Sequence, residues 1–215
     1  MPLARMTSVT IPELLAAIRT DPEHYLEVFS AEALGKFFAG YEHVDAGFDV
    51  IRKELLARHE EDGTRGPYIG TYLRFRDRAE GARYILEELS AIALALNPRS
   101  LPRPKSQVDS AALVADAVRQ GRPGMLIGEP SVESLFHFCQ GFQSGLDVVF
   151  PEHALAHAKR FREFEAWLES EHTPGRWCRV LRVHHGAGLD GVEAFVSLWA
   201  EFKQLEQVLP ARLPS

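Results

Sequence analysis

The feature that most constrains the fold of this chain is a segment that occurs twice, 101 positions apart. Residues 22–41 align without a gap with residues 123–142. Six of the twenty aligned positions are identical, where composition alone predicts roughly one. This repetition predicts two copies of one module. The identical pairs are Pro22 and Pro123, Ser30 and Ser131, Glu32 and Glu133, Leu34 and Leu135, Phe37 and Phe138, and Gly40 and Gly141.

The repeated segment has the pattern of a turn followed by a capped, amphipathic helix. In the second copy Pro123-Gly124 predicts the turn, and Ser131 is placed to accept a hydrogen bond from an amide at the start of the helix. A glycine inside a helix costs about 1 kcal/mol relative to alanine. Its presence at both Gly40 and Gly141 predicts that another backbone packs closely there. The apolar face recurs at three- and four-residue spacing: Leu135, Phe138 and Phe142.

Helical patterns continue on both sides of the repeated segment. In the first half the period runs on through Val44 to about His59, with a bend at Gly47, and resumes over residues 80–96. In the second half we expect helices over 111–119, up to about Phe150, from Pro151 onward and from Asp190 onward.

Two stretches are ambiguous between helix and strand. Tyr68–Phe75 predicts a short strand or an extended connection, and Trp177–Val183 fits a short strand or a helix. Prolines at 98, 102 and 104 predict a linker over residues 98–110. The predicted fold is therefore mainly α, with helical modules at 1–97 and 111–215 and room for one short strand or hairpin in each.

The charge balance narrows the choice of partner. Thirty acidic against 24 basic residues give a net charge of −6, which argues against a general binder of nucleic acid or anionic membranes and permits a basic protein partner. No apolar run approaches the ~18 residues that span a bilayer, and no signal-peptide pattern opens the sequence. We therefore expect a cytoplasmic protein with Cys139 and Cys178 as reduced thiols.

No catalytic or metal-binding motif is complete in the sequence. His153 and His157 are four residues apart, but the zinc peptidase pattern needs a glutamate directly after the first histidine, and Ala154 stands there. The glycines of 186–191 lack the full spacing of a dinucleotide-binding loop. We accordingly predict no catalytic residue, no cofactor and no metal.

The combination of segments resembles a group of small bacterial proteins with a helix, an Arg-Pro-Gly-Met turn and a Leu-x-x-Phe-x-x-Gly-aromatic helix. The turn stands here at 122–125 and the helix motif at 135–142, whereas the first copy has Thr-Asp-Pro-Glu-His at 20–24 instead of the turn. Proteins of this appearance are similar to immunity proteins encoded beside bacterial toxins. The resemblance continues through the second half at Phe161, Phe164, Trp167, Trp177, Asp190, Phe195 and Phe202.

This resemblance implies a non-catalytic function, namely binding a cognate toxin and neutralising it by occlusion. Two acidic clusters are the predicted partner-binding residues: Glu60, Glu61 and Asp62, and Glu169 and Glu171. A structural adaptor would differ only in the identity of its partner. The alternative from another class is an enzyme or small-ligand binder with a pocket between the modules, lined by His137, Trp177, His184 and His185.

Overall fold

The computed structural model describes residues 10–61, 78–96, 109–171 and 175–208, without the side chains of 60–61 and 206–208. Within these ranges the chain forms eleven helices and no strand, so the prediction of a mainly α fold is confirmed. The first ambiguous stretch, Tyr68–Phe75, lies outside the described residues. So does most of the predicted linker.

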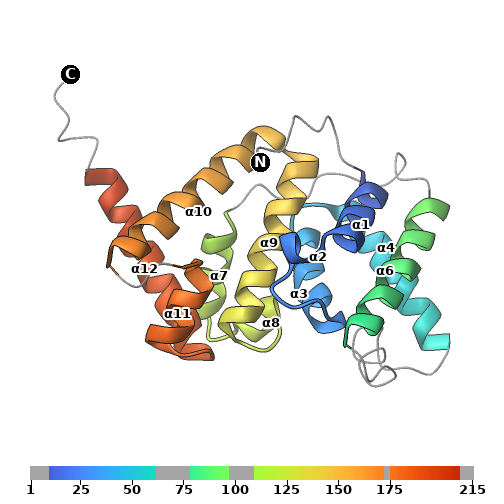
Figure 1. The fold of residues 1–215 in the computed structure, drawn as a ribbon, viewed down its shortest axis with the longest axis horizontal. Helices are drawn as coiled ribbons and strands as arrows, with labels where there is room; N and C mark the ends of the chain where they lie inside the picture. Colours follow the sequence, from blue (N-terminus) through green and yellow to red (C-terminus); the bar gives the residue numbers. More distant parts are fainter. Residues whose placement is uncertain (1–9, 62–77, 97–108, 172–174, 209–215) are drawn as a thin grey trace. The chain divides into compact units, whose positions relative to one another are not determined.

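The chain divides into two compact units, and each contains residues from both halves of the sequence. Unit 1 comprises residues 1–107 and 137–154, and unit 2 comprises 108–136 and 155–215. Unit 1 contains α1 (Ile11–Thr20), α2 (Pro22–Tyr25), α3 (Ala31–Glu42), α4 (Ala46–Glu61), α6 (Arg78–Ala95), most of α9 (Val132–Val149) and the start of α10 (Pro151–Glu171) (Figure 1).

Helix α1 follows from its capping residues and its apolar spacing. The Thr10 amide donates to the Glu13 carboxylate at 2.6 Å, which satisfies one backbone group at the helix start. Pro22 ends the helix because proline disfavours helical geometry in the residue before it. The apolar side of α1 packs against α6 through four buried residues: Ile11, Leu14, Leu15 and Ile18.

The predicted continuous helical period through Val44 is wrong, because α3 and α4 are separate helices. Asp45 is fully buried between them. Its Oδ1 accepts a hydrogen bond from the Gly47 amide at 2.8 Å, and its Oδ2 accepts one from the Tyr41 hydroxyl at 3.2 Å. An aspartate in this role starts a new helix. The break therefore lies at residues 43–45 and is not a bend at Gly47.

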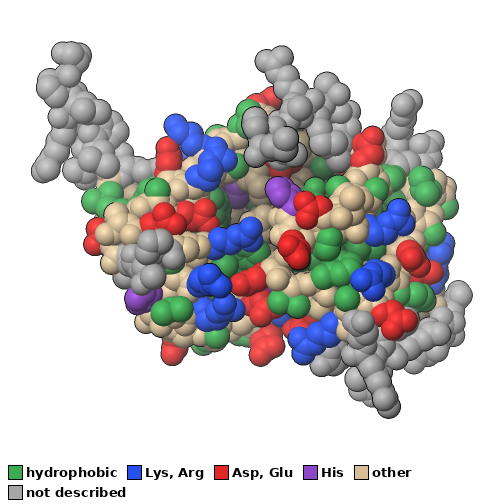
Figure 2. Space-filling view, viewed as in Figure 1, with side chains coloured by type: hydrophobic (Ala, Val, Ile, Leu, Met, Phe, Trp, Pro, Cys, Tyr) green, Lys and Arg blue, Asp and Glu red, His purple; other side chains and the backbone are tan. Residues whose placement is uncertain are grey.

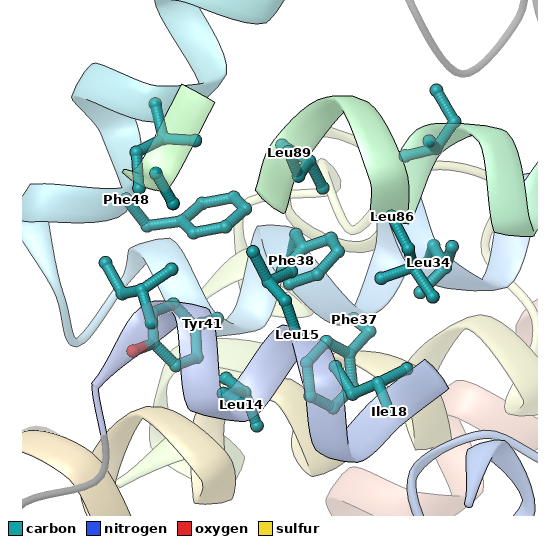
Figure 3. Close-up of a cluster of buried hydrophobic side chains, with 14 of the residues drawn as sticks. Leu14, Leu15, Ile18, Leu34, Phe37, Phe38, Tyr41, Phe48, Leu86 and Leu89 are labelled. Atoms are coloured by element: carbon teal, nitrogen blue, oxygen red, sulfur yellow. The ribbon is translucent and has the colours of Figure 1, made fainter. Parts of the chain in front are cut away.

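The core of unit 1 is a cluster of aliphatic and aromatic side chains from α1, α3, α4 and α6 (Figure 3). Phe38 of α3 stacks on Phe48 of α4 with ring centroids 4.5 Å apart, and Phe37 meets Phe38 edge to face at 5.3 Å. Leu86 and Leu89 extend this cluster from α6 (Figure 3). The apolar faces predicted from spacing therefore meet in one core.

Helices α3 and α9 contact one another backbone to backbone at the two repeated glycines. A Cβ on Gly40 would lie 2.9 Å from the carbonyl carbon of Phe138 and would overlap its oxygen. A Cβ on Gly141 would lie 2.6 Å from the carbonyl carbon of Phe37 and would likewise overlap its oxygen. The close backbone approach predicted from the glycines is confirmed, and each glycine contacts the residue three positions before the other glycine.

Unit 2 is organised around aromatic rings. Its helices, beside the first turn of α9 and the rest of α10, are α7 (Ser110–Arg119), α8 (Gly124–Ile127), α11 (Trp177–His185) and α12 (Leu189–Val208). Trp199 of α12 lies 4.7 Å from Phe161 and 4.9 Å from Phe164 of α10, and Trp177 lies 5.0 Å from Phe195. Helix α7 packs against α12.

The strand considered for Trp177–Val183 is wrong, since this stretch is helix α11. Burial follows a helical period, with four buried residues at 177, 178, 180 and 181 and exposed side chains at Arg179, Arg182 and Val183. A strand would have buried every second residue.

Within the described ranges, no helix is both long and apolar enough to cross a membrane.

Candidate functional site

The predicted acidic residues lie at the carboxyl-terminal ends of two helices. Glu60 and Glu61 are the last residues of α4, and Asp62 lies outside the described residues. Glu169 and Glu171 are exposed in the last turn of α10. Glu169 also has a local role, because its Oε1 accepts a hydrogen bond from the Gly175 amide at 3.2 Å. Glu171 is therefore the cleaner candidate for contact with a partner.

Of the four residues of the predicted pocket, His137 is in unit 1 and is completely buried in α9. Its Nε2 accepts a hydrogen bond from the Glu27 amide at 3.2 Å. The pKa of His137 is lowered to about 4, chiefly because the ring is buried; the Lys36 charge acts in the same direction and Glu32 opposes the shift. A neutral imidazole that holds the backbone before α3 is a structural group at neutral pH.

The other three pocket residues belong to unit 2. Trp177 is buried among the aromatic rings, whereas His184 and His185 are exposed in the last turn of α11. The pocket as such stays a prediction. Cys139 and Cys178 are both buried. No cluster of three or more His, Cys, Asp or Glu side chains suited to one metal ion occurs among the described residues.

A polar cluster that the sequence did not suggest lies where α7 begins. Ser110 is completely buried, and its hydroxyl is 3.0 Å from Nε2 of His157 on α10. Asp109 caps α7, since its Oδ1 accepts from the Ala111 amide at 2.9 Å. The carboxylate of Asp109 also lies 3.9 Å from His157 Nε2 and 3.6 Å from the Arg160 guanidinium.

This cluster has the residue types of a catalytic triad but a different geometry. In a triad the carboxylate binds the ring nitrogen opposite the one that faces serine, and the serine is open to substrate. Here Asp109 and Ser110 both approach Nε2, and Ser110 has no exposed surface. Burial lowers the pKa of His157, with Arg160 acting in the same direction and Asp109 opposing. The cluster therefore attaches the start of α7 to α10.

Sequence reasoning did not find this cluster because its members are 47 residues apart. The only local signal was the pair His153 and His157, which we considered as a metal site. In the structure the two histidines have different surroundings. His153 meets the Phe150 ring at 5.9 Å in unit 1, whereas His157 joins the polar cluster in unit 2.

Comparison with known proteins gives no match from which a function could be inferred. No protein family model, no curated protein and no solved structure matches this chain.

Proposed function

We propose that this protein is an immunity protein that binds a basic bacterial toxin through acidic helix ends and neutralises it by occlusion. The observation that carries the proposal is where the acidic residues lie. The described members of both predicted clusters lie at the carboxyl-terminal end of a helix, at Glu60 and Glu61 of α4 and at Glu169 and Glu171 of α10. The helix dipole disfavours an anion there by about 0.3–1 kcal/mol per charge. Helix stability therefore does not account for these residues.

We further propose that the two halves of the chain are copies of one module, with α4 and α10 as equivalent helices. Support comes from the helix starts, since Ser30 Oγ accepts from the Ala33 amide at 3.1 Å and Ser131 Oγ from the Ser134 amide at 3.1 Å. The pairing of α1 with α6 parallels that of α7 with α12, and the glycine contacts between α3 and α9 are reciprocal. In this view the acidic helix ends are a repeated feature.

Occlusion needs a surface that reaches its partner quickly and stays bound. A negatively charged patch raises the association rate with a basic partner, and salt weakens this effect. Acidic and basic side chains are interspersed over much of the face seen in Figure 2. The proposed recognition therefore depends on local carboxylates such as Glu171 and not on a uniform field.

The first test is protection of growing cells. The chain is co-expressed with a candidate toxin, chosen as a basic protein encoded beside its gene, and growth is compared with that of cells that express the candidate toxin alone. Protection, together with a one-to-one complex of the purified proteins, is the expected result. Growth arrest in the presence of the folded chain, with no complex formed, would refute the proposal.

The second test asks whether the acidic helix ends make the contact. The variant E60K/E61K is compared with E193K/E201K, which changes the net charge equally at two exposed positions of α12. We expect the association rate at low salt to fall about tenfold for the first variant and less than twofold for the second. Equal losses would mean that only the net charge matters. Glu169 is left intact because it binds the Gly175 amide.

A further inference from the structure

Helix α11 of unit 2 has an exposed basic face in a chain that is acidic as a whole. The stretch from Gly175 to Gly188 contains three arginines and two histidines but neither aspartate nor glutamate, whereas the net charge of the chain is −6. Arg176, Arg179 and Arg182 recur every third residue, and all three are exposed. Positions three apart are neighbours on a helix surface, with Cβ atoms about 5–6 Å apart.

The opposite side of α11 anchors the helix in unit 2. Its buried residues are Trp177, Cys178, Val180 and Leu181, and Trp177 joins the aromatic cluster at 5.0 Å from Phe195. A short helix anchored by four buried side chains presents its outer face with a fixed spacing. Less conformational entropy is then lost when a partner binds that face.

Helix stability accounts for only part of this charge. Arg182 lies in the last turn, where the dipole favours a cation. Arg176 packs over the Phe136 ring at 5.6 Å, in a cation–π arrangement. Arg179 lies in the first turn, where the dipole disfavours a cation. The helix dipole therefore does not account for the charge at Arg179.

An exposed apolar side chain among the arginines indicates the class of partner. Val183 is 70% exposed and follows Arg179 by four residues, so the two side chains are neighbours on the helix surface. Arginine pairs with carboxylate through two parallel hydrogen bonds. A polypeptide can offer carboxylates beside an apolar side chain, whereas a nucleic-acid strand offers phosphates along its edge. The combination favours a polypeptide.

We propose that the basic face of α11, formed by Arg179, Arg182 and Val183, binds an acidic polypeptide segment with an apolar side chain between its carboxylates. This surface is basic and lies on α11, whereas the surface proposed to bind toxin consists of the acidic ends of α4 and α10. The partner of the basic face is accordingly a second polypeptide, distinct from the toxin.

The test measures binding of synthetic probes to the full-length protein by fluorescence anisotropy at low salt. The main probe is a labelled peptide of repeating Glu-Glu-Leu. The comparison probes replace Leu by Ser, replace Glu by Lys, or are an oligo-dT strand. The variant R179E/R182E is compared with R19E/R83E, which changes the net charge equally at exposed positions of unit 1. Circular dichroism verifies that every variant is folded.

We expect saturable binding of the Glu-Glu-Leu peptide, about tenfold weaker for R179E/R182E and changed less than twofold for R19E/R83E. The substitution V183S should weaken binding of the Glu-Glu-Leu peptide and leave binding of the Glu-Glu-Ser peptide unchanged. Absence of binding, or equal losses for both double variants, would overturn the proposal. Equally tight binding of oligo-dT with the same sensitivity to R179E/R182E would overturn it in favour of phosphate recognition. These probes contain no toxin, so either proposal can fail without the other.

Discussion

Replacing Gly141 by alanine should loosen the contact between α3 and α9. An added Cβ would lie 2.6 Å from the carbonyl carbon of Phe37 and 3.1 Å from its Cα, whereas ordinary van der Waals contact begins at 3.4 Å. The neighbouring atoms are backbone and cannot rotate away as a flexible side chain would. The two helices must therefore separate by roughly 1 Å, at the expense of close-packed contacts.

The size of the effect follows from two opposing contributions. Overpacking a core typically costs about 1–3 kcal/mol, and a clash with backbone belongs at the upper end of this range. Alanine is a better helix former than glycine by about 1 kcal/mol. The net loss in the free energy of unfolding should be about 2 kcal/mol. In the double variant G40A/G141A the loss should be smaller than the sum of the single losses, because one separation of the helices relieves both clashes.

Urea unfolding followed by circular dichroism measures this loss, and hydrogen exchange in α3 and α9 localises it. Tryptophan fluorescence is less suitable, since Trp167, Trp177 and Trp199 all lie in unit 2. Gly124 is the matched control, because a Cβ there meets no atom within 4 Å. The reasoning is refuted if G141A is as stable as G124A, or if the losses in the double variant are strictly additive.

Two further predictions concern buried polar groups of unit 1. The pKa of His137 is lowered to about 4, so between pH 6.5 and 4 the unfolded chain binds more protons than the folded one, and stability should fall as the pH falls through this window. H137Q keeps an acceptor and should flatten the urea-unfolding profile over these pH values; a parallel profile would contradict the assignment. D45A removes the hydrogen bonds of Asp45 with the Gly47 amide and the Tyr41 hydroxyl, and should lower the free energy of unfolding in urea by about 1–2 kcal/mol. Y41F removes only the second bond and should lower it less. Equal losses for the two variants would exclude a capping role for Asp45.

Several candidate functional residues could not be identified from their spacing in the sequence. The residues of the acidic helix ends could be named because they are contiguous or two apart in the sequence. The cluster of Ser110, Asp109 and His157 could not be, because its hydrogen bond joins positions 47 residues apart. The basic face of α11 was missed for a different reason. Both a strand and a helix were compatible with Trp177–Val183, and only a helix places Arg179 and Arg182 on one face.

The sequence by itself determined the helical fold, because apolar spacing and capping residues act within a few positions of the chain. Ser30 and Ser131 were readable as helix starts, and Gly40 and Gly141 as places of close backbone contact. Only the tertiary structure shows that these two glycines lie at one contact, between α3 and α9. It also shows that residues 137–154 belong to unit 1 together with the first half of the chain. The physical reason is that the apolar face of a helix can be recognised from its own sequence. Which other apolar face it packs against depends on how all the helices pack together.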